Sequence, residues 1–263
     1  MAENTVQYRV EVVPALPASP PEPHCPVDRI REVCEKPTEK RLFPPSKGRT
    51  AEGEMRRLVM MERIESIMAK MLYQGHGSVR FKMNDGTVIY LDPYAGEGYD
   101  LPADYIFVTH EHHDHNEGDK MPHAPNCRVV TEKDAIRGGQ HLTFNFTTFQ
   151  VRAVEAYNSH HKKTECVGYI FLLDGKKVYC AGDTSTTAQM ADMAKMNIDY
   201  ALLPIDGVYN MGPAEAAKCA AMIGAAHVIP VHMAPGQLFD QQKAEQLDVP
   251  NRLILHPGEE IEL

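Results

Sequence analysis

The sequence has no apolar stretch suited to crossing a membrane as a single helix. Its longest run without an acidic or basic residue extends from Cys219 to Phe239, and that run contains prolines, glycines and two histidines. Such a composition is typical of helix, strand and loop in a globular domain. The N-terminus lacks the continuous apolar run of a secretion signal, because Glu3 and Arg9 interrupt it. We therefore expect neither a membrane span nor secretion.

Paired cysteine motifs and an excess of positive charge are also missing. The six cysteines are widely spread and form no CxxC, a pattern that favours reduced thiols in the cytoplasm over a disulfide framework. The chain has 27 basic and 36 acidic residues, a formal net charge of −9. This balance disfavours nucleic-acid binding by phosphate neutralisation, so a small-molecule partner is expected.

The chain divides into three parts by composition. Residues 1–51 form a proline-rich extension, since nine of the 19 prolines fall within the first 50 positions and proline excludes ordinary helix or central strand. The extension is either disordered or an arm that packs on the domain or on a second subunit of a homo-oligomer. Residues 52–73 have apolar side chains at helical spacing, which predicts an amphipathic helix. Residues 74–263 form the main domain.

The main domain begins with short strands and ends with alternating helices and strands. The expected strands are 79–83, 87–91, 105–109, 128–131, 151–154, 167–173, 176–180, 200–203 and 227–231, and the expected helices are 186–195 and 213–223. Strands first and strand–helix units later predict an α/β fold in which mixed sheets are covered by helices.

Four histidines fall within six positions directly after a buried strand. The segment reads His110-Glu-His112-His113-Asp114-His115. Protonated imidazoles at this density would repel one another, and neutral ones would be costly to bury without partners. Metal coordination removes both problems, because neutral imidazole is a preferred ligand of zinc and similar ions. The segment therefore predicts a metal site.

The spacing H-x-H-x-D-H resembles that of the metallo-β-lactamase superfamily. This resemblance implies an αββα sandwich of two mixed sheets covered by helices. It also implies that Gly182-Asp183-Thr184 carries an aspartate shared by two metal ions, and that His232 is the last histidine ligand. The stretch from Ala156 to Tyr169 is similar to that of zinc-dependent hydrolases related to L-ascorbate-6-phosphate lactonase.

This second stretch offers two candidates for a further ligand. Counting back from Gly168 favours His161 as the ligand, with His160 as the alternative, and the resemblance places Lys163 at the family's lysine position. Asn158 belongs to the same A-Y-N element and is expected to touch a ligand or the substrate.

Two weaker matches lie ahead of the histidine segment. Gly75-His76-Gly77-Ser78 resembles the G-H-x-S that opens the family domain, and Asp92-Pro93 resembles its second-strand D-P. We expect Asp92 to accept the free N–H of a ligand histidine, although a simple turn aspartate before proline fits nearly as well. His76 is either a group that faces the substrate or a satisfied structural histidine.

Together these residues predict two divalent metal ions, zinc above all, with manganese or iron(II) as alternatives. The expected ligands are His110, His112, Asp114, His115, His161, Asp183 and His232. With open positions on the ions, a metal-bound hydroxide would hydrolyse an ester, lactone, amide or phosphodiester, and Asp114 would be the catalytic residue. The other uses of the fold are a di-iron redox centre and a non-catalytic metal-binding module.

Overall fold

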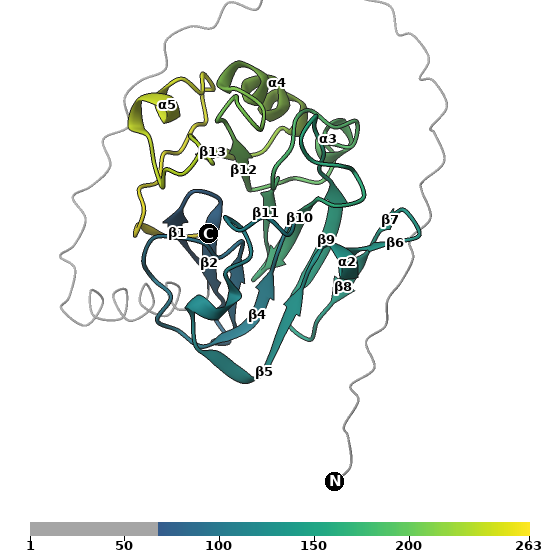
Figure 1. Ribbon diagram of the computed structural model, residues 1–263, viewed down its shortest axis with the longest axis vertical. Coiled ribbons are helices and arrows are strands. Elements are labelled where there is room, and N and C mark those ends of the chain that lie inside the picture. Colours follow the sequence, from purple (N-terminus) through teal and green to yellow (C-terminus); the bar gives the residue numbers. More distant parts are fainter. Residues whose placement is uncertain (1–67) are drawn as a thin grey trace, which may run out of the picture. The chain divides into compact units, whose positions relative to one another are not determined.

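The computed structural model describes residues 68–263, which form two six-stranded sheets (Figure 1). The first sheet has the order β14-β1-β2-β3-β4-β5 and the second has the order β13-β12-β11-β10-β9-β8. The strands of the first sheet are β1 (Lys70–Gly75), β2 (Ser78–Lys82), β3 (Val88–Leu91), β4 (Ala103–Phe107), β5 (His123–Val130) and β14 (Glu260–Glu262). Those of the second are β8 (Thr143–Asn145), β9 (Gln150–Glu155), β10 (Val167–Leu173), β11 (Lys176–Cys180), β12 (Tyr200–Pro204) and β13 (His227–Val231).

Both sheets are mixed, and their strand directions bring several carboxyl ends to one edge. In the first sheet β3, β4 and β5 are parallel, and β1 has the same direction because both β1 and β3 are antiparallel to β2. In the second sheet β11, β12 and β13 are parallel, and β9 shares their direction through the antiparallel β10. The loops that follow these strands therefore start from the same edge of each sheet.

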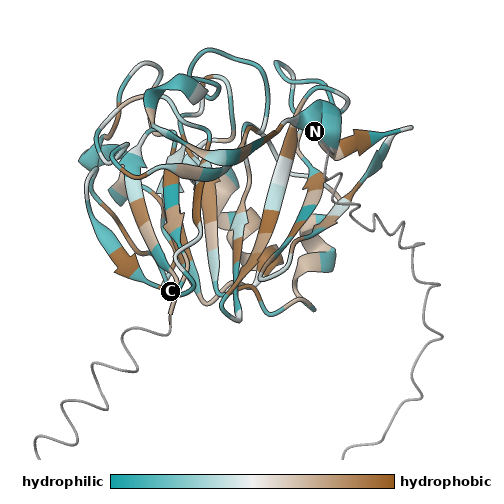
Figure 2. Ribbon diagram, turned by 90° about the horizontal axis from the view of Figure 1, so that it is seen from below, coloured by the Kyte–Doolittle hydropathy of each residue, from teal (hydrophilic) through white to brown (hydrophobic). Residues whose placement is uncertain are grey.

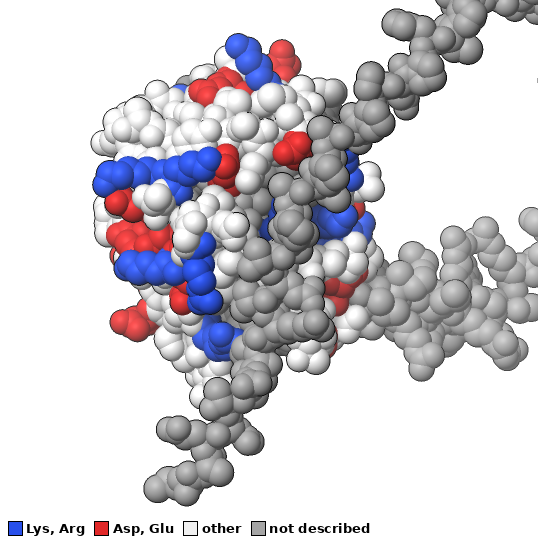
Figure 3. Space-filling model, turned by 90° about the vertical axis from the view of Figure 1, so that its right-hand side faces the viewer, with Lys and Arg blue, Asp and Glu red and all other residues white. Residues whose placement is uncertain are grey.

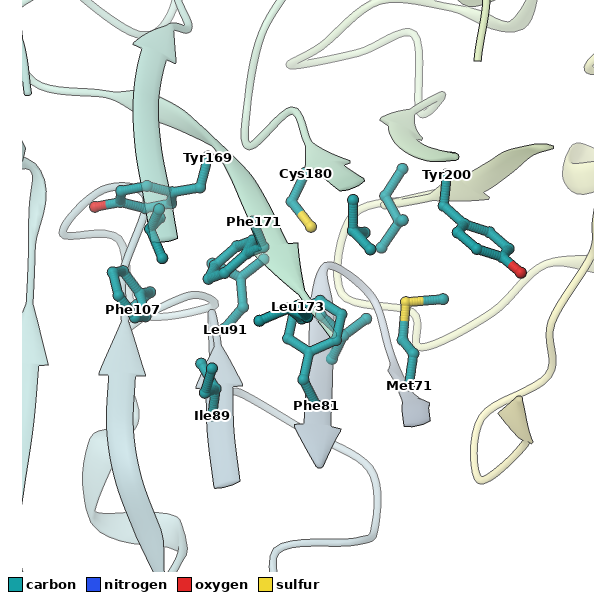
Figure 4. Close-up of a cluster of buried hydrophobic side chains, with 14 of the residues drawn as sticks. Met71, Phe81, Ile89, Leu91, Phe107, Tyr169, Phe171, Leu173, Cys180 and Tyr200 are labelled. Atoms are coloured by element: carbon teal, nitrogen blue, oxygen red, sulfur yellow. The ribbon is translucent and has the colours of Figure 1, made fainter. Parts of the chain in front are cut away.

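The main core lies between the two sheets. Large apolar side chains from both sheets meet there, and the ring centroids of Phe81 and Phe171 lie 5.2 Å apart (Figure 4). Phe107 contacts the rings of Tyr169 and Phe171 edge-on. These aromatic side chains are fully buried, and the strands show their apolar segments as brown bands (Figure 2). Burial of this kind stabilises the sandwich and fixes the spacing of the two strand edges.

The outer faces of the sheets are covered differently. The second sheet packs against α3 (Met190–Met193), α4 (Pro213–Ile223) and α5 (Gln241–Glu245) through a second apolar cluster. The outer face of the first sheet is covered by Tyr99, Leu101 and Met121, which lie in loops beside the short 3-10 helix η1 (Gly118–Lys120). The predicted α/β class with two mixed sheets is confirmed, and the helical layer is concentrated on the second sheet.

Two expected helices differ from what the structure shows. The predicted helix over residues 52–73 is wrong at its end, because residues 68–69 are not helical and residues 70–73 belong to β1. Residues 52–67 and the proline-rich extension lie outside the described residues. The strand β1 is buried on both faces after its first residue, so it lacks the alternation that marks a strand. The helix expected over 186–195 contracts to the single turn of α3.

Three short elements complete the fold. They are α2 (Glu132–Ala135), β6 (Ile136–Arg137) and β7 (Gln140–His141). On the face shown in Figure 3, basic side chains lie interspersed with acidic ones. Within residues 68–263, no helix has the length and apolarity needed to cross a membrane.

Candidate metal centre

Loops from the common strand edge supply every side chain of the candidate centre. In the first sheet, β1, β3 and β4 are followed by His76, by Asp92 and by the segment 108–115. In the second sheet, β9, β11, β12 and β13 are followed by segments carrying His161, Asp183, Asp206 and His232. Rigid strands thus hold a set of polar side chains that come from distant parts of the chain.

Three of these residues turn the chain sharply where a strand ends. His76, Asp92 and His232 each follow the last residue of a strand with positive φ angles of 54°, 46° and 44°. Residues other than glycine rarely adopt this left-handed backbone conformation, and such strain is concentrated at functional sites. The turn directs each side chain toward the shared edge instead of along the strand.

Asp183 lies at the middle of the cluster. Its Oδ2 is 3.4 Å from His232 Nε2, 3.5 Å from His161 Nε2 and 3.9 Å from His110 Nε2. Its Oδ1 is 3.4 Å from His115 Nε2. Asp183 is buried, so four ring nitrogens from three loops surround one carboxylate away from solvent.

Two groups of potential ligands lie on either side of Asp183. His110, His112 and His161 form one group, with His112 Nδ1 3.3 Å from His161 Nε2. Asp114, His115 and His232 belong to the other group, together with His76. The structure therefore brings together all seven predicted ligands and adds His76, a sixth histidine, beside them.

His76 contacts Asp114 and is fully buried, which places it away from solvent. Its Nε2 is 3.2 Å from Asp114 Oδ2, and its Nδ1 is 3.1 Å from the carbonyl oxygen of Gln237. Burial alone would raise the pKa of Asp114, but the hydrogen bond from His76 and the charge of His115 outweigh it, so the pKa lies below its ordinary value. Of the two interpretations of His76, the geometry supports a structural histidine over a group that faces the substrate. The buried ring orients the Asp114 carboxylate.

Asp92 orients two histidines of the cluster. Its carboxylate accepts the backbone N–H and the hydroxyl hydrogen of Thr109, both at 2.7 Å, and the N–H of His115 Nδ1 at 2.9 Å. The Thr109 oxygen, having donated its only hydrogen, accepts from His110 Nδ1 at 3.0 Å. Both rings therefore carry a proton on Nδ1 and turn Nε2 toward Asp183.

These nitrogens have the environment expected of metal ligands. The buried Nε2 atoms of His110, His115 and His232 and the Oδ1 atom of Asp183 have no hydrogen-bond partner in the structure. Buried polar atoms without partners are costly, and a cation between nitrogen and carboxylate would satisfy them. The donor set of imidazoles and carboxylates suits zinc and related divalent ions.

The protonation of the cluster is set by burial and by neighbouring charges. Burial, aided by the proximity of His115, lowers the pKa of His110 to about 2, so its ring is neutral. Burial also opposes charge on His115, but Asp183 and Asp92 outweigh it and raise its pKa to about 9. Burial raises the pKa of Asp183, yet the surrounding histidines lower it to about 2. A metal ion at this position would replace the second proton of His115.

Two candidates from the second stretch lie outside the cluster. His160 is exposed, and its ring meets that of Tyr209 edge-on with centroids 5.4 Å apart. Lys163 forms an ion pair with Glu155 and lies over the ring of Tyr157. The choice of His161 over His160 therefore agrees with the geometry, whereas Lys163 is not part of the group around Asp183.

The sequence reasoning missed Asp206 and Asn210. Asp206 Oδ2 is 3.1 Å from His232 Nδ1, an ion-pair contact without the alignment of a good hydrogen bond, and it accepts from Asn210 Nδ2 at 2.8 Å. Asp206 directly follows the buried segment Tyr200–Ile205 and precedes a glycine. Asp92 and Asp183, which were assigned by resemblance to family motifs, also follow strands, so position after a strand was an available signal for Asp206.

Comparison with known proteins agrees with the geometry. Residues 70–232 match the family described as the β-lactamase superfamily domain. The chain belongs to this superfamily. It is also 33% identical over 229 residues to a UPF0173 metal-dependent hydrolase of Geobacillus thermodenitrificans, an alignment that covers 74% of this chain and all of the relative. The predicted superfamily is confirmed, and the relative is named for the predicted class, a metal-dependent hydrolase.

Solved structures share the fold at lower identity. Igni18, a metallo hydrolase from the archaeon Ignicoccus hospitalis, is 22% identical with a TM-score of 0.57, covering 74% of this chain and 98% of its own. CmlA, a diiron β-hydroxylase from Streptomyces venezuelae, is 14% identical with a TM-score of 0.57, covering 74% of this chain and 54% of its own. These likenesses establish the two-sheet architecture and no more.

Proposed function

We propose that the chain is a binuclear metal-dependent hydrolase acting on an ester, lactone, amide or phosphodiester bond of a small molecule. The observation that carries the proposal is the set of partnerless ring nitrogens around Asp183. His110, His112 and His161 would hold one ion, Asp114, His115 and His232 would hold the other, and Asp183 would contact both. Divalent ions held in this way polarise a substrate oxygen and lower the pKa of water toward neutrality.

In this proposal Asp114 would help to hold one ion and orient a water molecule. About a quarter of its side chain is exposed (24%), whereas Asp183 is closed off at 5%. Its lowered pKa keeps Asp114 ionised, so the carboxylate is a hydrogen-bond acceptor at neutral pH. His76 fixes the position of that carboxylate from the buried side, which leaves the other side for water or substrate.

The loops around the centre carry aromatic rings and few free charges. Val208 and Tyr209 are exposed, the ring of Tyr209 lies against His160, and Tyr94 meets the rings of His76 and His113 edge-on. The lysines of the neighbouring loops each pair with a glutamate: Lys120 with Glu117, Lys162 with Glu165 and Lys163 with Glu155. These paired lysines would add little positive charge for a phosphate group beyond the metal ions themselves, so we favour an uncharged ester, lactone or amide as the substrate.

The metal identity separates hydrolysis from the di-iron alternative. His112 supplies an imidazole to the first group, and a centre richer in nitrogen favours zinc over iron. Elemental analysis of the purified protein should find two equivalents of zinc per chain. Iron in place of zinc would favour the redox use of the fold, and stable binding without turnover would favour a non-catalytic module.

The test combines metal content, stability and turnover. Chelation should lower the melting temperature, because the ions bind only the folded chain. Lactones, carboxylic esters and phosphodiesters are then screened with His112→Ala as the inactive variant and His160→Ala as the matched control. A protein that contains no metal, and is neither stabilised nor activated by zinc or manganese, would contradict the proposal. The homo-oligomer expected from the sequence stays a prediction, and light scattering would test it.

A further inference from the structure

A chain of side-chain contacts joins His232 to His161 behind the centre. His232 Nδ1 lies 3.1 Å from Asp206 Oδ2, which accepts from Asn210 Nδ2 at 2.8 Å. Asn210 Oδ1 accepts from Asn158 Nδ2 at 3.0 Å, and Asn158 Oδ1 lies 3.0 Å from His161 Nδ1. The three loops that these contacts link follow β13, β12 and β9, so the contacts span the edge of the second sheet.

Backbone donors fix the orientation of the Asn158 amide. Its Oδ1 accepts the backbone N–H groups of His160 at 2.8 Å and His161 at 2.9 Å. A backbone N–H can only donate, so the atom that faces these groups must be the oxygen. The Asn158 nitrogen consequently faces Asn210, and the reverse orientation of the amide is excluded.

Backbone donors also fix the orientation of the Asp206 carboxylate, which lies toward the other end of this series of contacts. Oδ1 of Asp206 accepts the backbone N–H groups of Val208, Tyr209 and Asn210 at 2.6, 2.7 and 3.2 Å. The carboxylate is buried and lies in a tight turn that these three bonds close. Its second oxygen accepts from Asn210 Nδ2 and lies 3.1 Å from His232 Nδ1.

We infer that Asp206, Asn210 and Asn158 form a positioning network that fixes the tautomers of His232 and His161. Each histidine faces an oxygen that can only accept, so each carries its proton on Nδ1. Each Nε2 is thereby left free of hydrogen and turned toward Asp183 Oδ2, at 3.4 Å for His232 and 3.5 Å for His161. That these nitrogens bind metal rests on the proposed function.

The network complements the role of Asp92 on the opposite sheet. Asp92 orients His115 directly and His110 through Thr109, while Asp206 contacts His232 directly and connects to His161 through two amides. Asp92 and Asp206 are thus each linked, directly or through other side chains, to one histidine from each of the two ligand groups. Groups that fix the tautomer of a ligand histidine contribute to metal affinity without touching the metal.

The substitution Asp206→Asn tests the network without a change of size. The three backbone donors would still require an oxygen at the Oδ1 position, so the new amide nitrogen would replace Oδ2. That nitrogen donates, which forces His232 Nδ1 to accept and moves its proton to Nε2. Long-range proton–nitrogen NMR correlations on the purified full-length protein without added metal should show this exchange at His232 and an unchanged His161, because a metal ion on Nε2 would itself hold the proton on Nδ1.

A second variant reports on the other end. Asn158→Leu removes the acceptor of His161 and should release its tautomer while His232 stays protonated on Nδ1. Both variants should lower zinc affinity by about 10- to 100-fold. Asp199→Asn is the matched control, because Asp199 also accepts a backbone N–H, that of Lys177, outside the cluster.

The outcomes separate this inference from the proposed function. A proton on Nε2 of either histidine in the unaltered protein, or an unchanged His232 tautomer in Asp206→Asn, would overturn the network. If the predicted tautomers are found but zinc does not bind, the network stands and the assignment as a metal-dependent hydrolase fails.

Discussion

Oδ2 of Asp92 lies 2.9 Å from Nδ1 of His115, and both side chains are buried. The pair joins the end of β3 to the loop after β4, since Asp92 also binds the backbone of Thr109. The carboxylate therefore links the local turn to the orientation of a ring in the centre.

Replacing Asp92 by asparagine should weaken metal binding more than it weakens the fold. The backbone N–H of Thr109 would retain the amide oxygen, so the new nitrogen would face His115 Nδ1 donor to donor. We expect metal affinity to fall by about 10- to 100-fold, measured by competition with a coloured chelator. Asp174→Asn is the control, because Asp174 also has a positive φ and accepts a backbone N–H, from Asn84. Equal effects of both substitutions would show that metal affinity depends on the turn conformation and not on the contact between Asp92 and His115.

The adjacent histidines His160 and His161 should differ in their effect on metal binding. His161 is buried with Nε2 facing Asp183, whereas His160 is exposed against Tyr209. His161→Ala should lower the metal content from two ions to one, and His160→Ala should leave it at two. Elemental analysis after desalting measures both variants, and the reverse result would mean that the loop has the other register.

Gly182 should be among the most sensitive glycines, because it supports Asp183. Its φ is +63°, and an added Cβ would lie 2.8 Å from the carbonyl oxygen of Val167 and 3.1 Å from Thr109. Gly138 has a similar φ of +58° with open space around it. We expect Gly138→Ala to cost about 1 kcal/mol and Gly182→Ala about 3 kcal/mol or more in unfolding free energy, measured by urea titration. Equal costs would show that the left-handed backbone conformation alone, and not crowding of the added Cβ, determines the loss of unfolding free energy.

The fold was predictable where local signals coincide with tertiary structure. The segment Val167–Cys180 was predicted correctly because Asp174-Gly175 closes a hairpin between two apolar runs. The helix Pro213–Ile223 was bounded by a first-turn proline and by Gly224, whose φ of +66° ends it. Strands without such signals were missed: β8 and β14 are short and partly exposed at sheet edges.

The candidate site was predictable to the extent that its chemistry lies in short motifs. The spacing of His110, His112, Asp114 and His115 indicates metal binding in itself, and the resemblance to the superfamily supplied Asp183 and His232. Asp206 was not found, because its role depends on the three-dimensional approach of His232 from another loop. Lys163 was assigned by resemblance, and a nearby glutamate on β9 pairs with it instead.

Glu132 offers a pH-dependent prediction away from the centre. Its side chain is buried at the start of α2, and Oε2 has no hydrogen-bond partner in the structure. Burial raises the pKa of this carboxyl above its ordinary value. The folded state therefore binds the proton more tightly than the unfolded chain does, so the contribution of Glu132 to stability is present in acid and is lost as the pH rises through the folded pKa.

Glu132→Gln should consequently stabilise the protein at neutral pH, where the glutamate is ionised. We expect the melting temperature to rise by about 2–4 °C, measured in the presence of a chelator so that metal binding does not contribute. The gain should shrink as the pH falls toward the ordinary range of a glutamate, because the carboxyl of the unaltered chain then becomes neutral as well. Glu117→Gln at an exposed position is the control and should change little at any pH. A gain at Glu132 that is independent of pH would mean that packing of the side chain, and not its charge, limits stability there.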